Sequence, residues 1–291
     1  MVTPFDQQGR VDFEAMKEHI DFLIEKGVNN LYPLGTMGEA ALMSVPERKE
    51  LAEKIVNYVD NRVGVFIHIG SLSQADAVEL ARHAESIGAD GVGAVSPYFY
   101  HIDQTDLYNY FAAISESVSE DFPVYMYNLP GMTGNDILPE TVVRLAQRSN
   151  IVGIKNTMPV DMRISQLSRS CPKDFDVISG DDLIALSGLT LGAKGLVTGT
   201  SNIFPEVLVS MYKRVQENDL RGAAAEQHKM YEIAEMLDCN YKPATIKAIL
   251  ELRGFRRTYS RAPLQRLCTE EEYAHFRSRL REIFAGRDYI A

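Results

Sequence analysis

A lysine at the end of an uncharged run is the first residue in this sequence that suggests chemistry. Lys155 follows Ile151-Val152-Gly153-Ile154, and such a short β-branched run is typical of a buried strand in a parallel sheet. Lysine is rarely buried without a partner, so the side chain either extends to solvent along apolar surface or is held there for its nitrogen. In apolar surroundings the pKa of a lysine falls, and the neutral amine can attack a carbonyl to form a Schiff base.

Two further segments supply groups that such an amine would need. Tyr127 ends the run Val124–Tyr127, one strand–helix–strand unit before Lys155, so the two residues are expected on neighbouring strands at the same height. Thr36 lies in Gly35-Thr36-Met37-Gly38, a turn whose backbone amides can face an anion. An amine, hydroxyl groups that relay protons and a cradle for a carboxylate are the requirements of Schiff-base chemistry on a 2-oxo acid.

Each of these residues also has an ordinary structural interpretation. Lys155 can simply cover apolar surface with its stem. Gly-Thr-x-Gly is a common turn, and a tyrosine at a strand end often packs its ring and leaves its hydroxyl in water. The combination, more than any one residue, favours catalysis.

The composition excludes several classes of function. The 30 basic and 40 acidic side chains give a net charge of −10, which argues against nucleic acid or an anionic membrane as a partner. No apolar run approaches the about 18 residues of a membrane span, and no signal peptide is recognised. The three cysteines, Cys171, Cys239 and Cys268, lie far apart, which fits a reducing cytoplasm. No cluster has metal-ligand spacing, so no metal is expected.

Short apolar runs alternate with amphipathic segments along most of the chain. The expected strands are Val2–Phe5, Asn30–Leu34, Val63–Ile67, Gly91–Val95, Val124–Tyr127, Ile151–Lys155, Asp176–Ser179 and Gly195–Thr198. The expected helices lie near 12–26, 46–58, 73–87, 104–119, 139–149, 160–170, 181–191 and 205–218. This order is typical of an α/β protein with a (β/α)8 TIM barrel; a doubly wound sheet is the alternative, but it rarely repeats so evenly.

The last part of the sequence contains only helical patterns. They cover about 219–237, 241–253 and 270–285, and no Pro/Gly/Ser-rich linker precedes them. The expected domains are therefore a catalytic barrel at 1–218 and a C-terminal three-helix extension at 219–291. Only four residues precede Phe5, so the first strand is either unusually short or preceded by residues that this sequence lacks.

Local signals support several helix boundaries. Ser44-Val45-Pro46-Glu47 resembles a capping box, and Ser73 stands where it can cap the next helix. Gly27 and Gly88 are expected to end helices.

The chain resembles the dihydrodipicolinate synthase/N-acetylneuraminate lyase family of class I Schiff-base aldolases, over nearly its whole length. The motifs that carry this resemblance are, in order, Thr3-Pro4-Phe5, Gly35-Thr36-Met37-Gly38-Glu39, Pro97-Tyr98-Phe99, Tyr127-Asn128-Leu129-Pro130, Gly153-Ile154-Lys155, Ser179-Gly180-Asp181-Asp182, Asn202 with Pro205, and Asn240-Tyr241-Lys242-Pro243 leading to Lys247. The resemblance implies a (β/α)8 barrel with a C-terminal helical domain and a homotetramer built as a dimer of dimers. It also implies that Lys155 is the Schiff-base lysine, Tyr127 the proton relay, and Thr36 both relay and carboxylate contact. No separate cofactor is implied, because the substrate itself forms the imine.

Several positions depart from the family pattern. Met37 stands where many relatives carry a second hydroxyl, and Met132 stands where the synthases carry an arginine that grips the aldehyde's carboxylate. Losing that arginine removes a bidentate, permanently charged anchor, which argues against aspartate semialdehyde as the acceptor. Phe99, with Tyr100 beside it, stands where the synthases present a tyrosine to a neighbouring subunit. His68 stands where relatives usually have glycine, and a packed histidine is favoured there over a catalytic one.

An acidic pair favours a polyhydroxylated substrate. In the sialate-cleaving relatives an acidic pair at this place binds sugar hydroxyls, and Asp181 and Asp182 are the corresponding residues. Carboxylates here can also cap a following helix, an interpretation that remains open for Asp181 in particular. Thr200 and Ser201 add further hydroxyls. The candidate substrate-binding residues are Met37, His68, Met132, Gly180, Asp182 and Thr200.

The leading expectation is a pyruvate-type lyase that cleaves or forms a carbon–carbon bond in a sialic-acid-like or 2-keto-3-deoxy sugar acid. The synthase reaction of lysine biosynthesis and a dehydratase reaction are alternatives. A non-catalytic keto-acid-binding barrel is disfavoured, because a binder need not keep Lys155, Tyr127 and Thr36 together. A phosphate-binding barrel is weakened by the lack of a Gly-rich phosphate loop. The expected partners are a small 2-oxo acid and an aldehyde, in the cytoplasm.

Overall fold

The computed structural model describes residues 1–158, 160–237 and 242–284, so Cys239, Asn240 and Tyr241 of the sequence motifs lie outside the described residues. The chain divides into two compact units. We call Asn30–Pro33 with Met43–Thr198 the sheet unit, and Met1–Asn29, Leu34–Leu42 and Gly199–Ala291 the terminal unit. The expected division at residue 218 stays a prediction.

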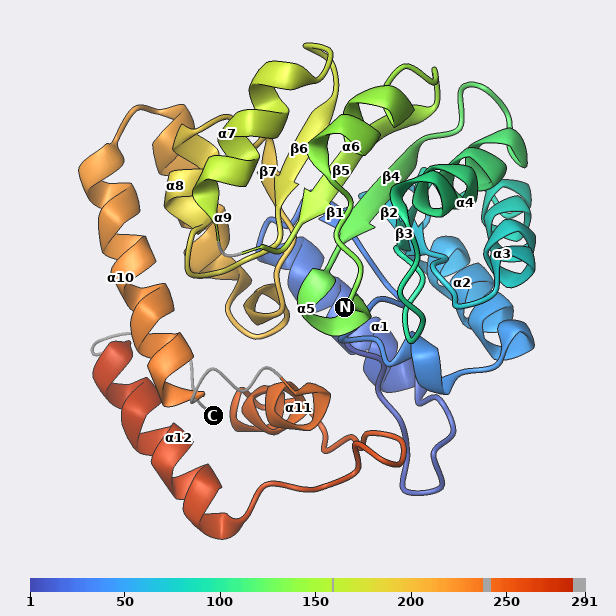
Figure 1. Cartoon of the computed structure of the whole chain (residues 1–291). Coiled ribbons are helices and arrows are strands. Elements are labelled where there is room, and N and C mark those ends of the chain that lie inside the picture. Colours follow the sequence, from blue (N-terminus) through green and yellow to red (C-terminus); the bar gives the residue numbers. More distant parts are fainter. Residues whose placement is uncertain (159, 238–241, 285–291) are drawn as a thin grey trace. The chain divides into compact units, whose positions relative to one another are not determined.

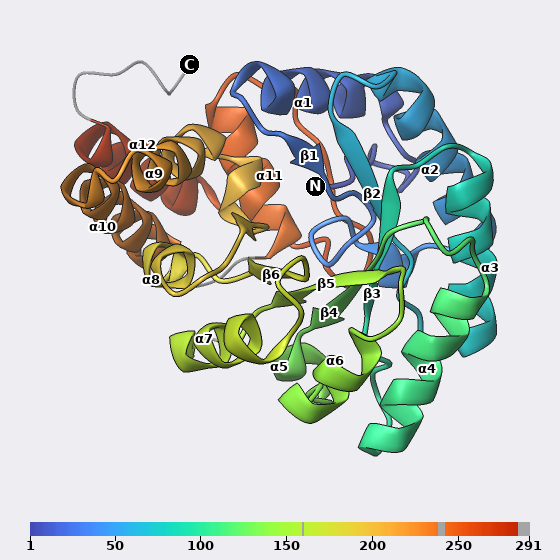
Figure 2. The ribbon, with the colours of Figure 1, turned by 90° about the horizontal axis from the view of Figure 1, so that it is seen from above.

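The sheet unit contains a seven-stranded parallel sheet in the order of the sequence. Its strands are β1 (Asn30–Leu31), β2 (Gly64–His68), β3 (Gly91–Val95), β4 (Val124–Asn128), β5 (Ile151–Asn156), β6 (Asp176–Ser179) and β7 (Gly195–Leu196). Its helices are α2 (Val45–Val59), α3 (Gln74–Ser86), α4 (Gln104–Glu116), α5 (Pro130–Thr133), α6 (Pro139–Leu145), α7 (Asp161–Ser170) and α8 (Ala185–Thr190). Strands and helices alternate, and α2, α3, α4 and α6 follow the outer side of the curved sheet (Figures 1 and 2). This arrangement confirms the barrel class.

Buried apolar residues explain this arrangement. All five residues of β3 are buried, which requires cover on both faces of the sheet. The helix α3 contributes a stripe of small residues, Ala77, Ala81 and Ala84, to that cover. Ser44 and Glu47 form the predicted capping box, and Ser73 accepts a hydrogen bond from the N–H of Asp76.

The terminal unit is mainly helical. It contains α1 (Phe13–Glu25), the short 3₁₀ turns η1 (Ala40–Leu42) and η2 (Thr200–Asn202), and then α9 (Pro205–Gln216), α10 (Leu220–Met236), α11 (Pro243–Leu252) and α12 (Glu270–Ile283). The helix α10 packs against both α9 and α12, and α11 packs against α12. The three helices α10–α12 confirm the predicted helical extension. None of the described helices is both long and apolar enough to cross a membrane.

The predicted strand at Val2–Phe5 is wrong. Phe5 forms only isolated antiparallel bridges, with Val11 and Tyr259, so the described sheet has seven strands instead of eight. The polar groups of this segment find other partners: the N–H of Val2 donates to Oδ1 of Asn202 at 2.8 Å, and Oγ1 of Thr3 donates to the carbonyl of Gly38 at 2.8 Å. These contacts satisfy the segment without a strand ladder.

Candidate active site

Lys155 lies near the carboxyl end of β5, directly beside Tyr127 in the register of β4 and β5. This neighbouring position is the one predicted from the sequence. The Lys155 Nζ lies 4.1 Å from the centroid of the Tyr127 ring and 5.6 Å from the centroid of the Tyr32 ring. The nitrogen therefore faces two aromatic rings at distances where a cation is attracted to the π electrons.

Tyr127 belongs to a cluster of three rings. Tyr32, His68 and Tyr127 meet one another edge to face, with centroid separations of 5.8, 6.2 and 6.1 Å and interplanar angles between 77° and 85°. We call these residues the aromatic cluster. Edge-to-face contacts of this kind fix the ring planes. Burial raises the pKa of Tyr32 well above its usual value, so its hydroxyl stays protonated.

His68 is buried within the sheet unit. Its Nε2 accepts a hydrogen bond from the N–H of Val95 at 3.4 Å, and its carbonyl accepts one from Nη2 of Arg48 at 2.9 Å. The buried Arg48 also donates to the carbonyl of Gly70 at 3.2 Å, so it ties α2 to the end of β2. These contacts are those of a packed ring and its support.

Gly180 gives the Lys155 side chain its space. A Cβ added at Gly180 would lie 2.8 Å from Cε of Lys155 and 2.5 Å from Cγ2 of Thr157. The N–H of Gly180 donates to the carbonyl of Asn156 at 2.8 Å, which fixes the backbone in this place. Any side chain at position 180 must therefore displace the lysine stem. The sequence suggested Gly180 only as a substrate contact and did not reveal this steric role.

Two buried asparagines, Asn128 and Asn156, directly follow Tyr127 and Lys155, and no role was predicted for them from the sequence. Asn128 Nδ2 donates to Oδ1 of Asn156 at 3.1 Å and to Oδ1 of Asp136 at 2.8 Å. The carbonyl of Asn128 also accepts from Thr157 Oγ1 at 2.7 Å. These bonds join the ends of β4 and β5 just beyond Tyr127 and Lys155. The signal that was available is the asparagine after each candidate residue.

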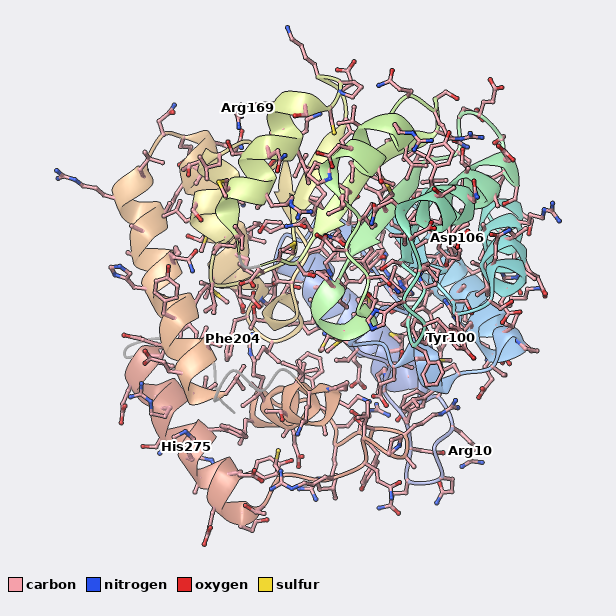
Figure 3. The ribbon with its side chains drawn as sticks, viewed as in Figure 1. Arg10, Tyr100, Asp106, Arg169, Phe204 and His275 are labelled. Carbon is pink, nitrogen blue, oxygen red and sulfur yellow. The ribbon has the colours of Figure 1, made fainter. Side chains whose placement is uncertain are left out.

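Two loops near these strand ends are joined and expose apolar side chains. Asn135 Nδ2 donates to the carbonyls of Pro97 at 2.9 Å and Tyr100 at 2.8 Å. Three side chains on these loops are largely exposed: Phe99 at 81%, Met132 at 67% and Tyr100 at 63%. Tyr100 is labelled in Figure 3. Such a group of exposed apolar residues is typical of a surface that meets another molecule.

The acidic pair follows β6. Asn156 on β5 pairs with Ser179 on β6, so the carboxyl ends of these two strands lie side by side. Asp181 and Asp182 therefore follow β6 at the same end of the sheet at which Lys155 lies. Asp181 Oδ1 accepts from the N–H of Leu183 at 2.8 Å, which is a local turn contact, and burial raises the pKa of Asp181. Asp182 is buried.

The other predicted residues lie in the terminal unit. The carbonyl of Thr36 accepts from the N–H of Glu39 at 3.2 Å, so the 35–39 segment closes as a turn. A Cβ added at Gly199 would lie 3.8 Å from Sδ of Met37, which places this turn next to the segment that leads to the fully buried Thr200. The structure thus groups Thr36, Met37 and Thr200, and separately groups Lys155 with Tyr127, His68 and Gly180.

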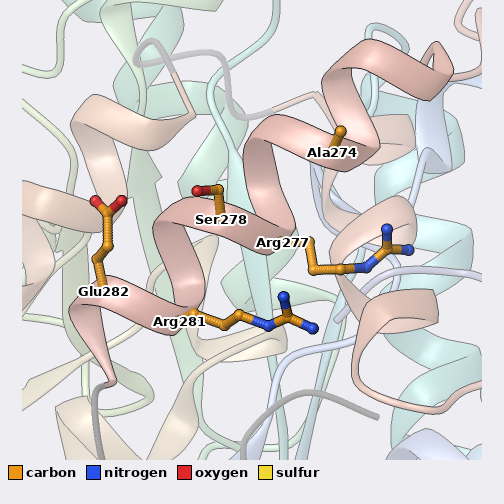
Figure 4. A pocket seen from close by; sticks show the side chains of 5 residues that line it. All are labelled: Ala274, Arg277, Ser278, Arg281 and Glu282. Carbon is orange, nitrogen blue, oxygen red and sulfur yellow. The ribbon is translucent and has the colours of Figure 1, made fainter.

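Within the described ranges, no group of three or more His, Cys, Asp or Glu side chains could hold a metal ion. A shallow pocket on α12, drawn in Figure 4, is lined by Ala274, Arg277, Ser278, Arg281 and Glu282. It contains none of the residues that the sequence singled out for chemistry.

Comparison with known proteins gives a consistent result. Residues 1–283 match the Dihydrodipicolinate synthetase family. The chain is 38% identical to a 4-hydroxy-tetrahydrodipicolinate synthase of Syntrophus aciditrophicus, covering 92% of this chain and 91% of that one. It is 41% identical to a "Probable 2-dehydro-3-deoxy-D-pentonate aldolase" of Escherichia coli K12, covering 79% and 77%.

Solved structures agree with these relatives. A prophage protein of the dihydrodipicolinic acid synthase family from Escherichia coli K12, crystallised with pyruvate, matches with a TM-score of 0.92 and 30% identity, covering 97% of this chain and 96% of that one. The dihydrodipicolinate synthase of Aquifex aeolicus matches with a TM-score of 0.91 and 30% identity, covering 97% and 95%.

Proposed function

We propose that the reaction of this protein proceeds through a Schiff base between Lys155 and pyruvate. The premise is that the chain belongs to the dihydrodipicolinate synthetase family of class I lyases and aldolases. The observation that carries this proposal is the placement of the Lys155 amine 4.1 Å from the ring of Tyr127, on the neighbouring strand. The solved relative that was crystallised with pyruvate supports the same acid.

The proposed steps assign each residue one task. The Lys155 amine attacks the C2 carbonyl of a 2-oxo acid, and the Tyr127 hydroxyl gives its proton to the C2 oxygen, which leaves as water; the products are a protonated imine and a Tyr127 hydroxylate. The Tyr127 hydroxylate takes the proton of the C4 hydroxyl, the C3–C4 bond breaks, and its electron pair moves into the imine to give an enamine and a free aldehyde. Tyr127 passes this proton on to C3, and addition of water to the imine then releases pyruvate and the neutral amine, while the proton set free returns to Tyr127. Thr36 and the amides of the 35–38 turn are assigned to the proton relay and the carboxylate. The imine serves as the electron sink, so no separate cofactor is needed.

The proposed substrate is a 2-keto-3-deoxy sugar acid, and sialic-acid-like acids belong to the same expected class. Three observations support this choice: Met132 offers no charge for a second carboxylate, the acidic pair follows β6 beside Lys155, and one relative is named as a 2-dehydro-3-deoxy-D-pentonate aldolase. The second candidate is 4-hydroxy-tetrahydrodipicolinate synthase, which is favoured by the relative of that name.

The assembly proposed from the family resemblance is a homotetramer. The exposed side chains of Phe99, Tyr100 and Met132 support a contact between subunits at these loops. We also propose that the protein is located in the cytoplasm.

Trapping with borohydride tests the chemistry. Pyruvate and borohydride should add a stable mass to Lys155, because reduction fixes the imine, and Lys155→Ala should lose both label and activity. Labelling that persists in Lys155→Ala would disprove the assignment of the nucleophile. A panel of 2-keto-3-deoxy sugar acids, sialic acid and the pair pyruvate plus aspartate semialdehyde, assayed for release or consumption of pyruvate, then ranks the substrates.

The variant Met132→Arg sharpens the choice of substrate. A guanidinium restores a bidentate anchor for a second carboxylate, so we expect use of aspartate semialdehyde to improve by at least about tenfold while trapping of pyruvate is unchanged. Efficient condensation of pyruvate with aspartate semialdehyde by the wild-type protein would instead establish the synthase.

A further inference from the structure

A fully buried ion pair joins two distant parts of the terminal unit. The Nζ of Lys247, on α11, lies 2.6 Å from Oε1 of Glu39, and their side chains are 2% and 0% exposed. Glu39 directly follows the 35–38 turn, and 208 positions separate the two residues. Taking two charges out of water is costly, so a pair like this persists only where hydrogen bonds satisfy both charged groups.

The pair is satisfied on every side that the structure describes. Lys247 Nζ also donates to the carbonyl of Tyr259 at 2.6 Å and approaches Oγ of Ser260 at 3.4 Å, while Phe5 offers its ring face at 4.8 Å. The second oxygen of Glu39 accepts from the backbone N–H of Arg261 at 2.8 Å. Burial lowers the pKa of Lys247 to about 8 and Glu39 partly offsets this shift, so the lysine is charged at neutral pH.

The shape of the 35–38 turn depends on how Glu39 is held. Glu39 has a positive φ of 56°, a conformation that costs free energy for a residue with a side chain. Its N–H donates to the carbonyl of Thr36, and Thr3 Oγ1 donates to the carbonyl of Gly38 at 2.8 Å. The carboxylate of Glu39 adds two further contacts that hold this residue, to Nζ of Lys247 and to the N–H of Arg261.

We propose that the Glu39–Lys247 ion pair positions the 35–38 turn, and with it the Thr36 hydroxyl and the turn amides, for the reaction. Both residues are positioning residues, since they act through the turn. The inference rests on the proposed function only in the task given to Thr36; the effect on the turn itself can be measured without catalysis.

The terminal unit also contains a second ion pair that serves as a matched control. Arg253, immediately after α11, pairs with Glu206 at 2.6 Å, and their side chains are 6% and 16% exposed. This second pair has a similar length and burial but joins α9 to α11, with no residue of the 35–38 turn. Glu206→Gln and Arg253→Met therefore remove a comparable ion pair.

The experiment compares Glu39→Gln, Lys247→Met and the double variant with the two control variants. We measure unfolding by urea, hydrogen exchange of the amides at 35–39, borohydride trapping at saturating pyruvate, and kcat and KM. We expect Lys247→Met to speed exchange at 35–39 and to lower kcat/KM by about 10- to 100-fold, because small displacements of reacting groups have effects of this size. Trapping at saturating pyruvate should persist, because Lys155 is unchanged.

The double variant guards against a simple folding defect. Removing both charges leaves no uncompensated charge in the core, so it should be more stable than Lys247→Met and yet keep the fast exchange and the lower kcat/KM. The control variants should lose stability but keep wild-type kcat/KM and wild-type exchange at 35–39. Wild-type exchange at 35–39 in both Lys247→Met and the double variant would overturn the inference. If the wild-type protein fails to trap pyruvate, the proposed function falls, and the exchange data still decide the role of the pair.

Discussion

Lys155 and Lys247 differ in what surrounds the amine. Among the described residues Lys155 forms no ion pair, and its nitrogen faces the rings of Tyr127 and Tyr32. Lys247 is fixed by a carboxylate at 2.6 Å and by a carbonyl at the same distance. An amine beside aromatic rings stays available to react, whereas one bound by a carboxylate and a carbonyl has no freedom to do so. The comparison teaches that neighbouring acceptors, more than burial alone, separate the proposed Schiff-base lysine from a lysine held in an ion pair.

The largest loss of catalytic rate is expected when the hydroxyl of Tyr127, next to Lys155, is removed. Tyr127→Phe removes a hydroxyl but keeps the ring near Lys155 and its contacts with the aromatic cluster. General acid–base groups contribute about 10²- to 10⁴-fold to the rate, and we expect kcat to fall in this range with little loss of stability. Single-turnover kinetics measure the loss of rate, and urea unfolding measures the stability. Turnover near that of the wild type would mean that another group moves the proton.

The second-largest effect is expected from the space beside Lys155, the proposed Schiff-base lysine. Gly180→Ala places a Cβ where Cε of Lys155 lies 2.8 Å away, so the amine must move. We expect about a 100-fold loss of kcat/KM and slower trapping by borohydride. Gly131→Ala is the control, because a Cβ there meets no atom within 4 Å. Equal trapping rates in the two variants would contradict the steric role of Gly180.

Variants of Tyr32 test whether the aromatic face near Lys155 stabilises the protonated imine. Tyr32→Leu removes a π face that lies 5.6 Å from the Lys155 nitrogen, whereas Tyr32→Phe keeps it. Because a desolvated cation near a ring is stabilised by about 1–2 kcal/mol, we expect the protonated imine to form roughly 5- to 30-fold more weakly in Tyr32→Leu. The equilibrium is read from trapping at graded pyruvate concentrations. Recovery in Tyr32→Phe identifies the ring as the cause, and a loss in both variants points to the hydroxyl instead.

The smallest effect on catalysis is expected from a buried histidine of the terminal unit. Burial lowers the pKa of His19 to about 4, from 6.5 in the unfolded chain, while its Nε2 donates to the carbonyl of Asn202 at 3.1 Å. The unfolded state therefore takes up a proton before the folded state does, and stability present above pH 6.5 is lost as the pH falls toward 4, by up to about 3 kcal/mol. Urea unfolding of the wild type and His19→Gln between pH 7 and 4.5 checks this expectation. The variant should lose less stability over this range, and equal slopes would contradict it.

Several features were accessible from local patterns. The apolar runs predicted β2 to β6 to within one residue at each end, because burial on both faces of the sheet leaves a continuous apolar run. The capping box at Ser44 and Glu47 was predicted because both partners lie within one turn. The predicted strands at 30–34 and 195–198 were longer than the observed β1 and β7, which end at Leu31 and Leu196. For β1, Pro33 lacks an N–H for the ladder.

The sequence by itself determined the alternation of strands and helices, and therefore the pairing of Tyr127 with Lys155 across one strand–helix–strand unit. Tertiary structure alone decided that Val2–Phe5 is not a strand, that Gly180 makes room for Lys155, and that Glu39 meets Lys247. Periodic patterns record which residues face the core within an element, and they carry no information on which distant side chain fills the same space. Glu39 and Lys247 meet only once α11 has packed against the segment that contains Glu39. That packing also removes the water that would otherwise solvate the two charges.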